Sequence, residues 1–203
     1  MARDFVIKNP EALLENMVLM QEILSKNKIV CFLYYGTLLG AIREKGFIPH
    51  DDDADIGIFD TDFDRVLTLI PTIVAAGFLF KSLRHGTTLQ FIRNDEQLDI
   101  YQAVHVWRPF GYRWTIDERL TVKGKHLDTL QKIDFLGHSF FIPSEPVKLL
   151  QILYGKTWKT PMKNIPTKTG WLWKFKKIKK APFKIIYYAN RYFKMQNIKN
   201  NGK

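Results

Sequence analysis

The sequence has one cysteine, no long apolar run and, over its last quarter, no acidic residue. A single cysteine, Cys31, excludes a disulfide within the chain, so nothing requires an oxidising compartment. No stretch reaches the roughly 18 consecutive apolar residues of a membrane-spanning helix. The first residues also lack the apolar core of a secretory leader. We therefore expect a cytoplasmic protein without a segment that crosses the membrane.

Charge is unevenly distributed along the chain. Residues 1–145 carry 16 Lys and Arg against 20 Asp and Glu, whereas residues 146–203 carry 15 Lys and Arg and no acid. Hydrophobic residues make up 46% of the 203 residues, which is typical of a globular domain rather than a disordered chain. We expect one catalytic domain over residues 1–165 and a basic, aromatic, helical tail over residues 166–203.

Hydrophobic periodicity and turn residues predict a mixed α/β (α+β) fold. Helices are expected over residues 10–26, 38–44, 63–76 and 146–154, with Asn9, Asp62 and Ser144 as caps. Strands are expected over residues 29–34, 54–59, 78–83, 88–93, 98–106 and 133–142. The segment 107–125 is aromatic and basic and has no clear period.

An acidic run is the main chemical signal. Asp51, Asp52, Asp53 and Asp55 lie within five residues, between apolar segments. Asp53 and Asp55 alternate with apolar residues of a strand, so they share a face, roughly 7 Å apart at Cα. That spacing suits one hard divalent cation, or two about 4 Å apart. Asp99, a lone acid inside an apolar strand, is a third candidate ligand because burying it unpaired is costly.

A solvated acidic loop is the alternative interpretation, and the turn that precedes the run argues against it. Gly36 and Thr37 end an apolar strand and open a helix, and backbone N–H groups at such a turn form an anion site. An anion site beside a pair of metal-binding carboxylates is typical of phosphoryl or nucleotidyl transfer.

Three segments of this sequence resemble the signature of the LicD family. They are GTLLGAIR at residues 36–43, GFIPHDDDADIG at residues 46–57, and the later Tyr154-Gly155 followed by Trp158 and Pro161. This family includes bacterial phosphocholine transferases and the fukutin-related ribitol-phosphate transferases. The resemblance covers roughly residues 11–161.

The resemblance implies a nucleotidyltransferase-like mixed sheet flanked by helices. It also implies transfer of a phospho-alcohol such as phosphocholine from a CDP-linked donor to a sugar hydroxyl, with Mg²⁺ or Mn²⁺ as cofactor. The acceptor is then a cell-surface glycan (lipopolysaccharide, capsule or teichoic acid) or its lipid-linked precursor. Asp53, Asp55 and Asp99 match the family's metal ligands, and Gly36 and Thr37 match the turn that holds the donor phosphates.

Other roles near the acidic run stay open. Arg43 is expected either to bind donor phosphate or to pair with Glu44 or Asp51. His50 stands where many family members have Trp, and is either a donor contact or a solvated loop residue. Ala54 also departs from the family, in which Ile or Val is common. The base that accepts the proton of the acceptor hydroxyl is Asp51 or Asp52, and the sequence does not choose between them.

The tail and the overall activity also have alternatives. Trp171, Trp173 and Phe175 lie among lysines, a pattern that suits the inner face of an anionic membrane. A basic segment packed on the domain is the alternative, and nucleic acid is not an expected partner. The runner-up activities are transfer of a nucleotide monophosphate to a small molecule, and a non-catalytic scaffold that binds glycan or membrane.

Overall fold

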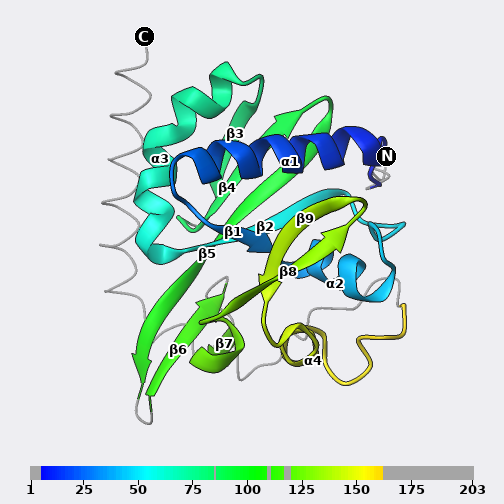
Figure 1. The fold of residues 1–203 in the computed structure, drawn as a ribbon, viewed down its shortest axis with the longest axis vertical. Coiled ribbons are helices and arrows are strands. Elements are labelled where there is room, and N and C mark those ends of the chain that lie inside the picture. Colours follow the sequence, from blue (N-terminus) through cyan, green and yellow to red (C-terminus); the bar gives the residue numbers. More distant parts are fainter. Residues whose placement is uncertain (1–5, 85, 109–110, 117–119, 162–203) are drawn as a thin grey trace. The chain divides into compact units, whose positions relative to one another are not determined.

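The structure is a computed structural model that describes residues 6–84, 86–108, 111–116 and 120–161 (Figure 1). Residues up to Lys159 belong to one compact unit. The predicted boundary at residue 165 and the predicted basic tail lie outside the described residues, so both stay predictions. Within the described ranges, no helix has the length and apolar character needed to span a membrane.

The elements form a mixed α/β fold, as the sequence predicts. The helices are α1 (Pro10–Lys26), α2 (Tyr35–Arg43), α3 (Asp60–Ala75), the 3-10 helix η1 (Gly124–His126) and α4 (Pro146–Tyr154). The strands are β1 (Cys31–Leu33), β2 (Asp53–Phe59), β3 (Leu79–Arg84), β4 (Thr88–Arg93), β5 (Glu96–Arg108), β6 (Gly111–Ile116), β7 (Leu120–Lys123), β8 (Leu130–Phe135) and β9 (His138–Pro143).

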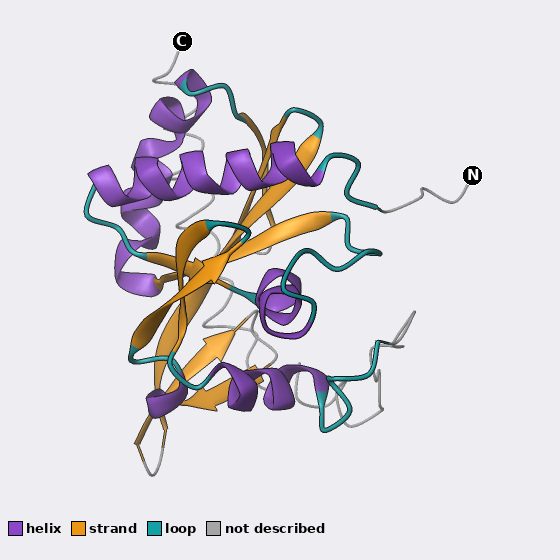
Figure 2. Cartoon of the chain, turned by 45° about the vertical axis from the view of Figure 1, so that its right-hand side comes forward, coloured by secondary structure: helices purple, strands orange, loops and turns teal. Residues whose placement is uncertain are grey.

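The central sheet has the strand order β1-β2-β5-β4-β3. Strands β2 and β5 are parallel, and the other neighbours are antiparallel. β5 is 13 residues long, so its second half runs past the central sheet and pairs with β6, which in turn pairs with β7. β8 and β9 form a separate hairpin. Figure 2 shows this arrangement with strands in orange and helices in purple.

Two long helices cover one face of the sheet. Both α1 and α3 contact β2 and β5 and also contact each other, so they lie on the same face. Alternate residues of β2 and β5 (Ala54, Ile56 and Ile58; Leu98 and Ile100) are buried and apolar. Residues at the intervening positions point to the opposite face, because side chains alternate along a strand. That opposite face carries Asp53, Asp55 and Asp99.

Three predicted details of helix ends are wrong or shifted. α3 begins at Asp60 with Phe59 as its N-cap, so Asp62 is not the cap; it lies in the first turn and pairs with Arg65 at 2.5 Å. α4 follows Glu145 rather than Ser144, without a side-chain cap. α2 begins three residues earlier than predicted, so Gly36 and Thr37 are its second and third residues.

The segment without a clear period contains β6 and β7. Their ribbon extends the second half of β5, and η1 follows it. α4 then contacts β7, η1, β9 and α2. This helix therefore lies between the ribbon and the end of the sheet that carries the acidic run.

Candidate active site

A cavity of about 320 Å³ lies where α2, the loop before β2, and α4 meet the acidic face of the sheet. Asp51, Asp53 and Asp55 line it on one side. Gly36 of α2 and Tyr154, the last residue of α4, line it as well. The structure therefore brings together the acidic run and the Gly36 turn, although they are separate in the sequence.

The parallel pairing of β2 with β5 explains the position of the third acid. Asp55 lies opposite Asp99, and Asp53 lies opposite Gln97. Paired residues on neighbouring strands project to the same face, so the three carboxylates share one surface of the sheet. Asp53 and Asp55 therefore lie on one face of β2, as the two-residue period of the sequence predicts.

Asp99 is fully buried and held by amide and guanidinium donors. Gln90 Nε2 donates to both of its oxygens, at 3.3 and 3.1 Å, and Gln97 Nε2 donates to Oδ1 at 3.0 Å. Arg84 Nη2 lies 3.7 Å from Oδ2. Asp99 does not line the cavity, although it lies beside Asp55 on the neighbouring strand. Its role as a direct metal ligand stays a prediction.

The Gly36 turn and the acidic strand form one hydrogen-bonded unit. The Gly36 N–H donates to Asp55 Oδ2 at 2.9 Å, and the Asp55 N–H donates to Thr37 Oγ1 at 2.7 Å. The Tyr34 N–H donates to the Asp55 carbonyl oxygen at 3.0 Å. Thr37 is only 2% exposed, so its hydroxyl positions Asp55 rather than facing the cavity.

Carboxylates approach Gly36 so closely that any larger residue there would have to displace one of them. A Cβ at this position would overlap Asp51 Oδ2 and lie 3.3 Å from Asp55 Oδ2. The preceding residue, Tyr35, has φ of 35°, a left-handed conformation that is uncommon outside glycine. The predicted anion site at this turn is therefore partly filled by the protein itself, since the Gly36 N–H already serves Asp55.

Crowding and burial raise the pKa values of the carboxyl groups. Burial, then the charges of Asp99 and Asp51, raise the pKa of Asp53 to about 7. Burial, followed by the neighbouring Asp52, raises the pKa of Asp51 to about 6. The pKa of Asp55 is also raised, first by burial and then by Asp53. A positive charge beside these groups would favour their ionised forms.

The donor atoms fit a hard divalent cation. One oxygen from each of Asp51, Asp52 and Asp53 lies within 4.8 Å of the others. Carboxylate oxygens are the ligands that magnesium and calcium prefer, and no sulfur or imidazole takes part in this group. Asp53 belongs both to this group and to the predicted set with Asp55 and Asp99.

Arg43 and His50, the other predicted binding residues, lie in different surroundings. Arg43 Nε donates to Glu44 Oε1 at 2.6 Å and its Nη1 donates to the Trp158 carbonyl oxygen at 3.0 Å. Arg43 does not line the cavity, whereas His50 lies exposed at its edge. Phosphate binding by Arg43 and donor contact by His50 stay predictions.

Three tyrosines of the cavity wall are not among the predicted site residues. Tyr35 and Tyr101 pack edge to face with ring centroids 4.7 Å apart, and Tyr154 also lines the cavity. Burial, then the charge of Asp55, raise the pKa values of Tyr101 and Tyr154, so both hydroxyls stay protonated donors. Signals for two of them exist: Tyr101 follows Asp99 at i+2 on the same face, and Tyr154 opens the Tyr-Gly motif.

Comparison with known proteins identifies relatives along most of the described chain. The LicD/FKTN/FKRP family, nucleotidyltransferase domain, matches residues 28–145. The mouse (Mus musculus) ribitol-5-phosphate transferase FKTN is 32% identical over 153 residues, which are 70% of this chain and 31% of that protein. The human (Homo sapiens) protein of the same name is 28% identical over 170 residues, 79% of this chain and 34% of that protein.

Solved structures give a more distant likeness. The lincosamide antibiotic adenylyltransferase LnuA, bound to lincomycin, has a TM-score of 0.47 and 11% identity, over 71% of this chain and 85% of that chain. At this distance the likeness adds nothing on the fold or the chemistry of this chain. The chain spans about a third of the length of the FKTN proteins that it matches. By the family match over residues 28–145, the chain belongs to the LicD/FKTN/FKRP family through its nucleotidyltransferase domain.

Proposed function

We propose that this chain is a metal-dependent phospho-alcohol transferase that uses a CDP-linked donor and a glycan hydroxyl as acceptor. One observation carries the proposal: the Gly36 turn is hydrogen-bonded to Asp55 beside a cavity lined by Asp51 and Asp53. Relatives named ribitol-5-phosphate transferase favour ribitol phosphate or a similar phospho-alcohol as the transferred group. The acceptor is a surface glycan or its lipid-linked precursor.

Asp53 and Asp55, which match the family's metal ligands, are the residues that would hold the cation, and Asp99 lies beside Asp55. The oxygens of Asp51 and Asp52 lie within 4.8 Å of one on Asp53 and could complete the coordination. When bound, Mg²⁺ or Mn²⁺ neutralises the donor diphosphate and stabilises the charge that develops on it. Asp99 keeps Gln97 in place, and Gln97 Nε2 in turn lies 3.4 Å from Asp53 Oδ2. The amides thus orient the carboxylates even before a cation binds.

The reaction forms one bond and breaks one. The acceptor hydroxyl oxygen attacks the phosphorus that carries the alcohol, the bond from that phosphorus to the oxygen of CMP breaks, and CMP leaves. The hydroxyl proton passes to a carboxylate. Asp51 is better placed for this role than Asp52, because Asp51 lines the cavity while Asp52 is exposed and does not.

Nucleotidyl transfer is the second candidate, and the name of the matching domain favours it. In that reaction the acceptor attacks the phosphorus that carries the nucleoside, and the phospho-alcohol leaves instead. The same carboxylates serve both reactions. The identity of the released product therefore separates them.

Release of CMP from CDP-ribitol, CDP-choline and CDP-glycerol tests the proposal. We expect Mg²⁺-dependent CMP release with one of these donors in the presence of a glycan acceptor. The Asp53→Asn, Asp55→Asn double variant should release none while keeping the far-UV circular dichroism of the native protein. CMP release at the native rate by this folded double variant would refute the assignment of the site.

Membrane contact belongs to the same proposal. The 15 basic residues and no acid over residues 146–203 favour attachment to an anionic membrane surface. A lipid-linked acceptor would then be concentrated beside the cavity. This part of the proposal rests on sequence alone, because most of that segment lies outside the described residues.

A further inference from the structure

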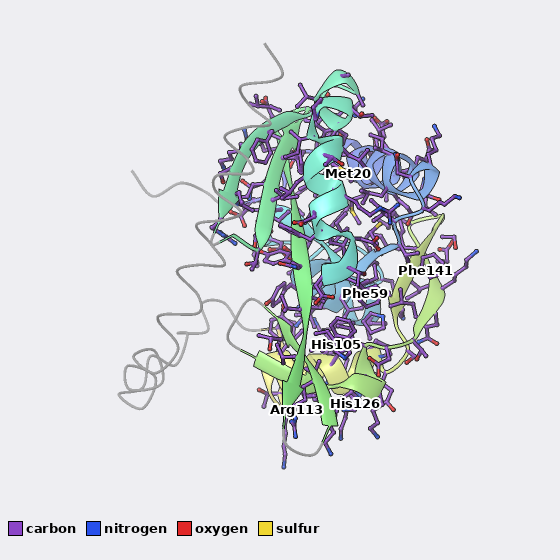
Figure 3. All side chains as sticks on the ribbon, turned by 90° about the vertical axis from the view of Figure 1, so that its left-hand side faces the viewer. Met20, Phe59, His105, Arg113, His126 and Phe141 are labelled. Atoms are coloured by element: carbon purple, nitrogen blue, oxygen red, sulfur yellow. The ribbon has the colours of Figure 1, made fainter. Side chains whose placement is uncertain are left out.

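A second cavity of about 320 Å³, here called the basic pocket, lies between the β6–β7 ribbon, η1 and α4. Its polar lining consists of Arg113, Lys123, Lys125, Lys148 and His126. Figure 3 labels Arg113 and His126 near this end of the sheet, below His105. Four side chains with a full positive charge therefore converge on one hollow from four different elements: β6, β7, η1 and α4.

The positive charge of the basic pocket exceeds the negative charge that the described residues place beside it, because four cations face two carboxylates, Glu145 and Asp128. Among the described residues, no ion pair joins any of these Lys and Arg side chains to a carboxylate. Two nearby acids have other partners. Glu145 Oε2 bonds His126 Nδ1, and Asp128 Oδ1 accepts from Trp114 Nε1 at 2.6 Å. The pocket therefore has the electrostatic character of an anion site.

The floor of the basic pocket is firmly built. His126 is 4% exposed and is fixed by Glu145, while Val122 is 1% exposed. Ile152 completes the apolar part of the lining from α4. Lys123, Lys125 and Lys148 are exposed and Arg113 is half-buried, so the cations form the rim of a hollow whose floor is fixed.

α4 connects the basic pocket to the acidic cavity. Lys148 and Ile152 line the pocket, and Tyr154, at the end of the same helix, lines the cavity. Six residues separate Lys148 from Tyr154, which corresponds to about 9 Å along the helix axis. A single oligosaccharide is long enough to reach both sites.

We propose that the basic pocket binds a phosphate or similar anionic group on the acceptor, at a distance from the hydroxyl that reacts. This inference rests on the proposed transfer function. A cation held by Asp53 and Asp55 would attract the diphosphate of the donor, which leaves the anion site on the other side of α4 for the other substrate. The pocket would then select anionic over neutral glycans.

Binding of inorganic pyrophosphate without metal tests the pocket separately from catalysis. With EDTA present, the carboxylates of the acidic cavity repel anions, so pyrophosphate reports on the basic pocket. We expect saturable shifts of the Val122 and Ile152 methyl resonances of the full chain. The Lys123→Gln, Lys148→Gln double variant should bind at least tenfold more weakly.

The matched control is the Lys26→Gln, Lys132→Gln double variant. It removes the same charge from a different hollow, between α1, β1 and the β8–β9 hairpin. It should bind pyrophosphate as the native chain does, and basic residues of the tail contribute equally to all three proteins. Equal affinity of the two double variants, or no saturable shift at Val122 and Ile152, would overturn the anion site.

Two further arms identify the source of the anion. With a phosphorylated oligosaccharide as acceptor, the Lys123→Gln, Lys148→Gln variant should have a KM about tenfold higher than the native protein and an unchanged kcat. With the same oligosaccharide after phosphatase treatment, KM and kcat of the variant should both equal those of the native protein. Loss of binding to phosphatidylglycerol vesicles with an unchanged KM would instead assign the pocket to lipid headgroups and overturn the acceptor inference. Absence of transfer would refute the proposed function and leave the pyrophosphate result intact.

Discussion

Replacing Asp53 by Asn should make the metal-free protein more stable at neutral pH and remove much of its pH dependence. Burial and neighbouring acids raise the pKa of Asp53 from 3.8 to about 7, so the folded state holds this proton where the unfolded state has lost it. A raised carboxyl pKa contributes stability that is complete below about pH 4 and is lost as pH rises through about 7.

The magnitude follows from proton linkage. With pKa values of about 7 folded and 3.8 unfolded, the contribution of Asp53 to the free energy of unfolding falls by about 2 kcal/mol between pH 5.5 and pH 7.5. For a chain of this size that corresponds to a loss of about 4–8 °C in Tm. The side chain of Asn cannot titrate, so the Asp53→Asn variant should lack this fall.

Urea unfolding in EDTA at both pH values measures the difference directly. The matched control is Asp95→Asn, an exposed residue of the turn between β4 and β5 whose left-handed φ of 59° asparagine also adopts readily. The control should keep the pH dependence of the native protein. If Asp53→Asn falls in stability between pH 5.5 and 7.5 as much as the native protein does, the carboxylates do not crowd one another as described.

Three other changes give distinct outcomes. Gly36→Ala should weaken Mn²⁺ binding at least tenfold in isothermal titration while Gly46→Ala does not, because a Cβ at residue 36 overlaps Asp51 Oδ2 and crowds Oδ2 of the proposed ligand Asp55 at 3.3 Å, whereas at residue 46 the nearest atom is 3.8 Å away; equal affinities would contradict this. Gln90→Leu should lower the free energy of unfolding at pH 7.5 by about 1–3 kcal/mol, since it leaves the buried Asp99 carboxylate without its Gln90 donor; an unchanged urea midpoint would exclude that role. Deletion of residues 171–203 should abolish co-sedimentation with anionic vesicles and spare activity on a soluble acceptor, and equal co-sedimentation of both proteins would disprove membrane docking by the tail.

Local signals predicted the parts of the fold that depend on neighbouring residues. α1 begins at Pro10 because the Asn9 side chain accepts from the Ala12 N–H, a cap that the sequence displays. β2 follows from the alternation of acids with apolar residues. The common face of Asp53 and Asp55 needs only the two-residue period of a strand.

Other features depend on contacts between distant segments. β6 and β7 exist because Gly111–Ile116 pairs with the end of β5, and their mixed aromatic and basic residues give no alternating pattern. α2 begins at Tyr35, three residues earlier than predicted, although the left-handed φ of Tyr35 is one that no local preference for helix would favour. The amides that hold Asp99 come from β4 and from the same strand, and only the register of the sheet brings Gln90 opposite it.

In the candidate site, too, some features follow from the local sequence and others depend on contacts between distant segments. The motif around residues 36–55 predicted which residues meet, since the Gly36 turn and Asp55 are joined by hydrogen bonds. It did not predict that the Gly36 N–H serves a carboxylate, or that Asp99 does not line the cavity. Tyr154 reaches the cavity only because α4 packs against α2.

The mass gained by the acceptor tests the central claim most directly. Native protein, Mg²⁺, a CDP-linked alcohol and a glycan acceptor are incubated, and the acceptor is analysed by mass spectrometry beside the Asp53→Asn, Asp55→Asn variant. The account predicts that the acceptor gains the mass of the phospho-alcohol with the native protein only. Gain of a cytidine monophosphate, or the same gain with the folded double variant, would contradict it.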